Sequence, residues 1–184
     1  MNKPAARRAV IAALGLSALG VTACATAAPR PFPGQTFHAT GIAQRLVVAH
    51  NRERAAVRVR PLAWDPLLAA AASSYARQLA ANGRFEHSRR SERRGTGENL
   101  WTGSRGAFSL EHMAGNWASE KRWFRPGLFP NVSTTGDWVQ VGHYSQMVWP
   151  TTTRLGCGMA SGRGRDVLVC RYAPAGNIDG RRVP

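Results

Sequence analysis

Two short strand patterns near the C-terminal end of the chain restrict its fold more than any other feature. Residues 155–160 and 167–172 have the pattern of β-strands, and Gly162-Arg163-Gly164 predicts the turn between them. Helix patterns precede this hairpin. Helices that come first and a hairpin that comes last indicate an α+β fold rather than a doubly wound parallel sheet.

Three segments have apolar residues at the spacing of an amphipathic helix. The first helix is expected to begin at Thr40. The second spans residues 66–82, because Asp65 can cap its first turn and a proline fits the first helical position. The third spans residues 110–123, with Ser109 as its cap.

The first part of the chain has the pattern of an export signal. A positively charged start is followed by an uncharged apolar stretch over residues 9–21, which is shorter than the roughly 20 residues of a membrane-spanning helix. We therefore expect residues 1–24 to be a signal peptide, 25–38 a tether rich in proline and alanine, and 39–184 the folded domain. A buried N-terminal helix is the alternative, and the prolines that follow it disfavour it.

The end of the leader leaves two forms of export open. Val21-Thr22-Ala23-Cys24 resembles a bacterial lipobox, in which the leader is cut before a cysteine that then receives lipid. This predicts lipidation of Cys24 and a periplasmic or outer-membrane lipoprotein held to the membrane by its anchor. Ordinary cleavage after Ala25 or Ala27 would instead release a free secreted protein.

The other two cysteines fall on the two strands of the hairpin. Cys157 and Cys170 lie thirteen residues apart, and an exported protein meets an oxidising compartment. A disulfide between them is therefore expected, which leaves no odd thiol in the folded domain. A metal site is disfavoured, because neither cysteine has a CxxC neighbour.

The charge is strongly basic and almost entirely arginine. The chain has 25 basic and 10 acidic residues, and without the leader 22 basic residues remain. Such a surface attracts phosphate-rich partners, but an exported protein rarely meets nucleic acid, so no nucleic-acid partner is expected. An anionic component of the cell envelope is one interpretation, and a composition bias that serves solubility is the other.

Four segments combine polar or ionisable residues with glycine or tryptophan in an unusual local setting. They are His50-Asn51-Arg52-Glu53-Arg54, Gly97-Glu98-Asn99-Leu100, residues 142–149 (GHYSQMVW) and residues 168–178 (LVCRYAPAGNI). In this order, and with Pro61-Leu62-Ala63-Trp64-Asp65, they resemble the CAP superfamily of cysteine-rich secretory, antigen 5 and plant pathogenesis-related proteins. The resemblance covers residues 38–178. It departs from the family at residues 58–60, where an arginine-containing run replaces a glycine, and in lacking the family's larger cysteine frameworks.

The resemblance implies a three-layer α-β-α sandwich and a cleft with two histidines and two glutamates. Matched to the family's motifs, these are His87, Glu98, Glu120 and His143. Family members bind divalent metal through the two histidines, so His87 and His143 are the expected ligands of zinc or another divalent ion. Glu98 and Glu120 would hydrogen-bond a metal-bound water or orient an imidazole.

Other motif residues are expected to have structural roles. Hydrogen bonds to buried backbone or scaffold groups are expected for six of them. They are His50, Asn51, Arg54, Asn99, Gln146 and Asn177. Three tryptophans are expected in the core: Trp64, Trp117 and Trp149.

Three functions compete for this sequence. The leading hypothesis is a monomeric, non-enzymatic binding module for a divalent metal and a lipid-like, sterol-like or cell-surface ligand. The second is a metal-assisted, protease-like hydrolase that uses the same four cleft residues as acid and base. It lacks an obvious nucleophile, since neither Ser88 nor Ser145 has a supporting motif, and no catalytic residue is assigned. The third is adhesion to an anionic envelope surface.

Overall fold

The described part of the chain begins with a helix and ends with the expected hairpin and a short final strand. The structure is a computed structural model, and it describes residues 41–184. In chain order its elements are α1 (Ile42–Ala56), β1 (Ala63–Trp64), α2 (Pro66–Asn82), β2 (Gly97–Ser104), α3 (Leu110–Ser119), the 3₁₀ helix η1 (Glu120–Arg122), β3 (Gly127–Leu128), the 3₁₀ helix η2 (Trp138–Val141), α4 (Gly142–Met147), β4 (Arg154–Gly162), β5 (Arg165–Ala173) and β6 (Arg182–Val183).

The predicted leader, Cys24 and the whole predicted tether fall outside the described residues. Residues 41–184 lie in one compact unit, which contains every described element and both clusters of core side chains. A unit with its own hydrophobic core can fold independently. Within residues 41–184, no helix has both the length and the apolar character needed to cross a membrane.

The main sheet has the strand order β1-β4-β5-β2, so β2 lies at one edge. β4 and β5 pair antiparallel, as do β5 and β2, whereas β1 pairs parallel with β4. The hairpin turn is shorter than expected: Gly162 pairs with Arg165, and only Arg163 and Gly164 form the turn. Both have positive φ angles, 50° and 74°, as two-residue hairpin turns require.

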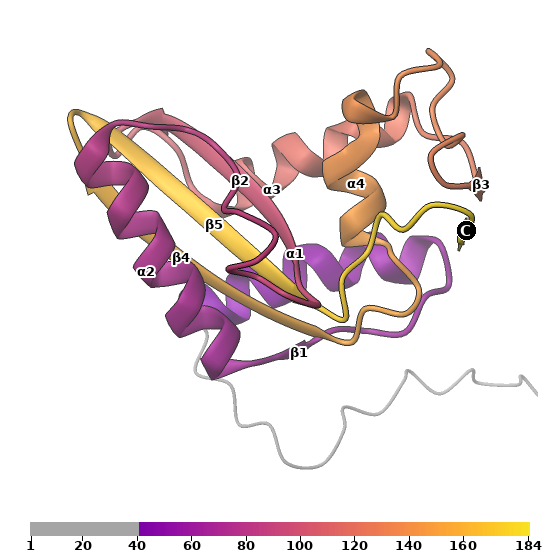
Figure 1. Cartoon of the computed structure of the whole chain (residues 1–184), viewed down its shortest axis with the longest axis horizontal. Coiled ribbons are helices and arrows are strands. Elements are labelled where there is room, and N and C mark those ends of the chain that lie inside the picture. Colours follow the sequence, from indigo (N-terminus) through magenta and orange to yellow (C-terminus); the bar gives the residue numbers. More distant parts are fainter. Residues whose placement is uncertain (1–40) are drawn as a thin grey trace, which may run out of the picture. The chain divides into compact units, whose positions relative to one another are not determined.

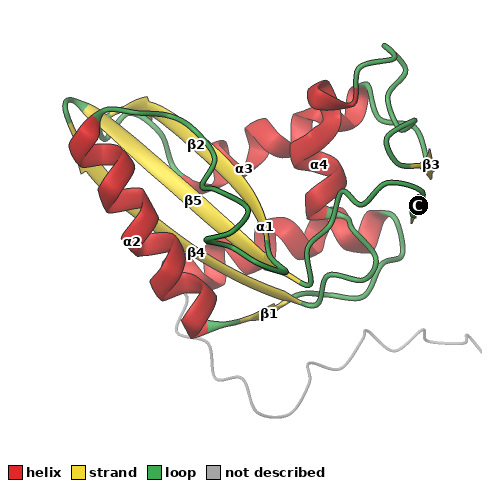
Figure 2. Cartoon of the chain, viewed as in Figure 1, coloured by secondary structure: helices red, strands yellow, loops and turns green. Residues whose placement is uncertain are grey.

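Helices cover both faces of this sheet (Figures 1 and 2). α2 packs on one face, where Val167 and Val169 of β5 join its core cluster. α1, α3 and α4 pack on the other, where Leu168 and Tyr172 of β5 face them. Alternate residues of one strand thus serve two cores. This is the three-layer α-β-α sandwich that the resemblance implied.

α2 lies against β4 because glycines on that strand leave room for the helix backbone. A Cβ atom at Gly156 would lie 2.2 Å from the backbone nitrogen of Ala69, and one at Gly158 would lie 2.3 Å from Cα of Ser73. Both distances are far below van der Waals contact. A larger residue at either position would force the helix away from the sheet.

The prediction of α2 is confirmed, α1 begins at Ile42 rather than at Thr40, and the predicted third helix is too long. Asp65 caps α2 by accepting hydrogen bonds from two backbone N–H groups, and Gly83 ends it in the left-handed conformation. The third helix was expected to reach residue 123. It ends at Ser119, and the chain continues as the 3₁₀ helix η1 to Arg122. Ser109 caps it as expected.

The cysteine prediction is confirmed, because Cys157 and Cys170 form a disulfide. The two residues lie directly opposite each other on β4 and β5. Both side chains are buried on the face covered by α1, α3 and α4.

The structural roles expected for the motif residues are also observed. Arg54 is fully buried and donates to four backbone carbonyls, at residues 60, 147, 149 and 152, which ties α1 to the end of α4. His50 bonds the Leu46 carbonyl and the Tyr172 hydroxyl, and Asn51 exchanges two hydrogen bonds with the backbone of Leu62. Trp117 and Trp149 are in the core, and Trp64 packs against it half-buried.

Candidate functional site

The first of two histidine–glutamate pairs lies where α3 meets α4. Glu120 begins η1 directly after α3, and its Oε1 accepts a hydrogen bond from Nδ1 of His143 at 2.6 Å. Its Oε2 accepts from the backbone N–H groups of His143 and Tyr144, at 2.9 and 3.0 Å. A single carboxylate therefore caps the first turn of α4 and orients its histidine.

The second pair lies at the start of β2. Nδ1 of His87 bonds Oε1 of Glu98 at 2.8 Å, and the same carboxylate accepts from the backbone N–H and the hydroxyl of Ser88. Nη2 of Arg171, which is opposite Glu98 in the sheet register, lies 3.0 Å from Oε2. Burial raises the pKa of Glu98, but the hydrogen bonds of His87 and Ser88 and the charge of Arg171 outweigh it, so the net pKa is lowered. Glu98 is therefore a carboxylate at neutral pH.

Both histidines are fixed in the same way and present the same atom. Because an ionised carboxylate can only accept, Nδ1 of His87 and of His143 carries the proton in each pair. Nε2 of each neutral ring then has a free lone pair, which can bind a metal or accept a proton. The imidazoles are accessible, with 53% of the His87 side chain and 34% of the His143 side chain exposed.

The edge strand β2 contacts both pairs. Successive residues of a strand point to opposite faces, so Glu98 shares the α2 face with Leu100, whereas Asn99 points to the other face. There Asn99 donates to the backbone carbonyl of His143. The strand thus carries one pair directly and holds the other through its neighbouring residue.

A cavity of about 300 Å³ lies beside the Glu120–His143 pair. Four of its eight lining residues are aromatic or apolar, and the Glu120–His143 pair is among the four polar ones. The lining residues are Phe85, Leu100, Trp101, Thr102, Asn116, Trp117, Glu120 and His143. His87 and Glu98 of the second pair are not among the lining residues. The cavity suits a small ligand with an apolar body and one polar end.

Each pair contributes one imidazole as a potential nitrogen donor. Among residues 41–184, no three side chains of His, Cys, Asp or Glu come together as a metal-binding group. The structure therefore does not unite the four expected cleft residues into one cluster. The glutamates already accept hydrogen bonds from the rings, which is the orienting role that a carboxylate has behind a histidine ligand.

Neither candidate serine is bonded to a histidine. The hydroxyl of Ser88 donates to Glu98, and that of Ser145 lies 2.7 Å from Oδ1 of Asn177. Asn177 also donates to the Gly142 carbonyl, as a scaffold residue. A serine nucleophile activated by histidine is therefore not formed within residues 41–184.

Sequence reasoning missed several residues that build the site. Arg171 supplies the buried positive charge beside Glu98, and its position among the apolar residues of β5 was the signal for it. Trp101 follows the Gly97-Glu98-Asn99-Leu100 motif directly and lines the cavity. Lys121 lies 3.0 Å from the buried carboxylate of Glu53 on α1, a contact that no local pattern indicates.

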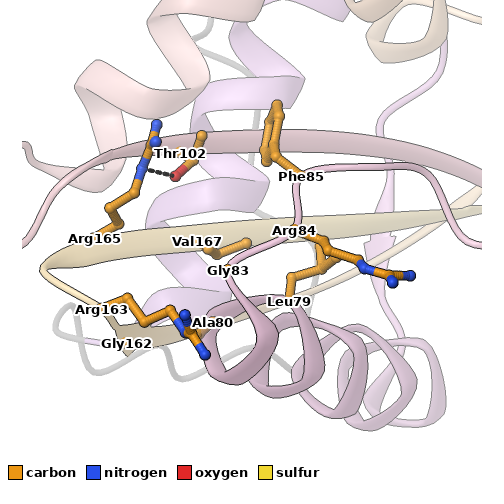
Figure 3. A pocket seen from close by; sticks show the side chains of 10 residues that line it. All are labelled: Leu79, Ala80, Gly83, Arg84, Phe85, Thr102, Gly162, Arg163, Arg165 and Val167. Carbon is orange, nitrogen blue, oxygen red and sulfur yellow. Dashed lines mark hydrogen bonds between the residues drawn. The ribbon is translucent and has the colours of Figure 1, made fainter.

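A much smaller pocket, of about 20 Å³, lies between the end of α2 and the turn of the β4–β5 hairpin (Figure 3). Its volume is that of about one water molecule. Three arginines line it, but their guanidinium groups lie apart in Figure 3, and one of them bonds Thr102. This pocket does not form a convergent anion site.

Known proteins place the chain among secretory proteins. The Cysteine-rich secretory protein family, CAP, matches residues 47–172. Pathogenesis-related protein 1C of Nicotiana tabacum is 35% identical over 145 residues, covering 78% of this chain and 82% of that protein. Pathogenesis-related protein 1 of Arabidopsis thaliana is 40% identical over 129 residues, covering 70% and 73%. The solved structure of NaASP2 with Zn²⁺ has a TM-score of 0.67 at 26% identity, covering 78% of this chain and 85% of that one.

The chain therefore belongs to the CAP family. The resemblance drawn from its motifs is confirmed, and so is the fold that it implied. Membership of a family of secretory proteins supports export of the protein. Whether it carries lipid on Cys24 stays a prediction.

Proposed function

We propose that the protein is an exported binding module that holds a divalent metal ion, zinc first, through Nε2 of His87 and of His143. The observation that carries the proposal is that both histidines donate Nδ1–H to a glutamate, at 2.8 and 2.6 Å, and so present Nε2 as a lone pair. Neutral imidazole is the usual nitrogen ligand of zinc, and a carboxylate behind it fixes the tautomer and strengthens the ligand.

The proposed donor set consists of the two imidazoles, one from each pair. Glu98 and Glu120 would stay behind the rings, and water would complete the shell. The similarity to NaASP2, whose structure was solved with Zn²⁺, supports zinc as the first ion to test. A bound zinc would supply a Lewis acid at the edge of the cavity.

The cavity beside His143 supports a second ligand with an apolar body. Trp101 and Trp117 supply aromatic walls, and Glu120 and His143 supply a polar end. We propose a small lipid-like molecule, or an apolar group on a cell-surface partner, as this ligand. Its volume of about 300 Å³ lies at the small end of ligand sites.

The test is calorimetric titration of Zn²⁺ into metal-free protein. Wild type is expected to bind one ion, and His87→Ala and His143→Ala should each weaken binding at least tenfold. His112→Ala is the matched control, because this exposed histidine on α3 belongs to neither pair. Unchanged affinity in both pair variants would refute the proposal. Peptide turnover that a chelator abolishes would instead support the hydrolase alternative.

A further inference from the structure

One end of the domain exposes an unusual number of large apolar side chains. We call residues 121–141 and 177–184 the loop end. They carry five of the ten large apolar residues that are exposed among residues 41–184. The five are Trp123, Leu128, Trp138, Val139 and Ile178. The loop end has only 29 of the 144 described residues, so this is a concentration rather than the usual scatter of apolar groups on a surface.

The segments of the loop end are joined to one another. β3 pairs with β6 next to the C-terminus, so the two lie side by side in Figure 1. The backbone of Phe129 exchanges hydrogen bonds with residues 180 and 181. Its ring packs edge-on against Trp138 with the centroids 5.0 Å apart. Trp138 is therefore held in place while 40% of its surface remains exposed.

The loop end is also basic, and the side chains of its arginines are exposed to solvent. Lys121 pairs with Glu53, but the four arginines, at positions 122, 125, 181 and 182, are exposed. None of these four has an ion pair or a side-chain hydrogen bond within the described residues. Arg122 instead lies over the ring of Trp123, 5.7 Å from its centroid. Two exposed aspartates, Asp137 and Asp179, are the acidic residues of this region.

The rest of the domain provides a contrast. Its five exposed large apolar residues are distributed over α1, α2, β4 and two loops: Val48, Leu67, Met159, Phe85 and Phe108. Seven exposed arginines elsewhere, at positions 58, 60, 77, 89, 90, 94 and 105, also have no ion pair or side-chain hydrogen bond within the described residues. The loop end differs in that its free arginines lie in the same segments as the concentrated exposed apolar side chains.

We propose that the loop end is a docking surface for an anionic lipid bilayer. Tryptophan favours the boundary between headgroups and acyl chains, where its ring is apolar and its N–H is wet. Arginine reaches anionic headgroups and covers apolar surface with its stem. The aliphatic side chains of Leu128, Val139 and Ile178 favour a bilayer over a polysaccharide, because they insert among acyl chains but offer nothing to a sugar.

This surface is separate from the histidine–glutamate pairs and needs no metal. The proposal therefore goes beyond metal binding, and either one can fail alone. It also gives the four free arginines of the loop end a partner. A predicted lipid anchor at Cys24 would bring the domain to a bilayer, but docking at the loop end does not depend on it.

The test uses residues 37–184, which lack the leader and Cys24, so that neither can bind lipid. Sedimentation with vesicles is measured in EDTA, with phosphatidylcholine alone or with 30% phosphatidylglycerol. Binding is expected only to the anionic vesicles and should fall at least tenfold in half-molar salt. Brominated lipids should quench tryptophan emission, because exposed tryptophans enter the interface.

Paired variants locate the surface. Two double variants should each lower the partition coefficient at least tenfold: Trp138→Ser with Val139→Ser, and Arg181→Gln with Arg182→Gln. For the arginine pair, the reason is that each basic residue near an anionic membrane contributes about fivefold. The controls are Val48→Ser with Leu67→Ser and Arg77→Gln with Arg105→Gln, which alter exposed residues elsewhere.

Three results would overturn the proposal. One is no binding to anionic vesicles. Another is an equal loss in the control variants, which would mean diffuse charge attraction. The third is tighter binding to an acidic polysaccharide without quenching by brominated lipid, which would identify sugar rather than bilayer as the partner.

Discussion

The two histidine–glutamate pairs look alike in sequence and differ in how each carboxylate is held. The Glu98 side chain is fully buried and has Arg171 beside it, with Arg93 at 3.9 Å. The Glu120 side chain is 19% exposed and has no cation within 4 Å among the described residues. It binds two backbone N–H groups at the start of α4 instead.

This difference separates two ways of orienting a histidine. Glu98 forms a buried ion pair with Arg171, so its carboxylate contributes to the stability of the fold as well as to the orientation of His87. Around Glu120 the backbone supplies the donors, and less depends on the charge. The two pairs therefore should respond differently to the same substitution.

The largest expected effect is on the free energy of unfolding of Glu98→Gln. The substitution leaves Arg171 buried without its counter-charge, and we expect a loss of about 3–5 kcal/mol. Glu120→Gln keeps an oxygen for the backbone donors and should cost about 1 kcal/mol. Urea denaturation followed by circular dichroism measures both, with the exposed Glu86→Gln as control. Equal losses in the two variants would break the comparison.

The elements that carry these pairs were the hardest to predict from sequence. α2 and the β4–β5 hairpin have local signals, namely the Asp65 cap, the glycine after Asn82 and the strand patterns. β2 has none, because Gly97-Glu98-Asn99-Leu100 combines a charge and an amide where a strand would alternate. It becomes a strand because it pairs along its whole length with β5, where Glu98 meets Arg171, 73 positions further along the chain.

α4 was missed for a related reason. It has six residues and begins with glycine, and a helix so short is not stable on its own. Glu120 caps its start, and Arg54 bonds the carbonyls near its end. The four cleft residues were found through family resemblance. Their arrangement as two separate pairs depends on long-range contacts that no spacing indicates.

The next effect concerns His50, the buried histidine without a carboxylate partner. Burial lowers its pKa to about 4, because the hydrogen bond to the Leu46 carbonyl offsets only part of the burial effect and the nearby charge of Arg54 lowers the pKa further. Its ordinary value is 6.5, so the unfolded chain binds the proton more tightly. The contribution to stability is complete above pH 6.5 and is lost as the pH falls to about 4, by about 3 kcal/mol.

Unfolding free energies between pH 7 and 4 measure this dependence. The difference between wild type and His50→Gln should shrink by that amount as the pH falls, since glutamine does not titrate. His112→Gln, on the exposed side of α3, should run parallel to wild type. Parallel curves for His50→Gln would show that burial alone does not distinguish His50 from the two paired histidines.

A smaller effect sharpens the role of charge around Glu98. A double-mutant cycle of Glu98→Gln and Arg171→Met removes both charges, and the double variant should be more stable than the sum of the two losses predicts. We expect a coupling energy of about 2 kcal/mol, because one partner no longer stays buried alone. Glu120→Gln with Arg171→Met is the control cycle and should be additive. A coupling energy near zero in the first cycle would mean that the hydrogen bonds of Ser88, not the Arg171 charge, hold Glu98.

The smallest effect tests whether the Glu120 pair depends on α1. Lys121 stands next to Glu120 and bonds the buried carboxylate of Glu53, so it fixes η1 against α1. Because the Lys121 side chain is 57% exposed, Lys121→Met should cost about 1 kcal/mol or less. The informative readout is the imidazole nitrogen NMR spectrum, in which the Nδ1 signal of His143 should shift while that of His87 stays. Arg52→Met removes the weaker contact to Glu53 at 3.3 Å and is the matched control. If both histidine signals move together, the two pairs form one coupled unit, and the contrast between a buried charge pair and a backbone cap does not describe the site.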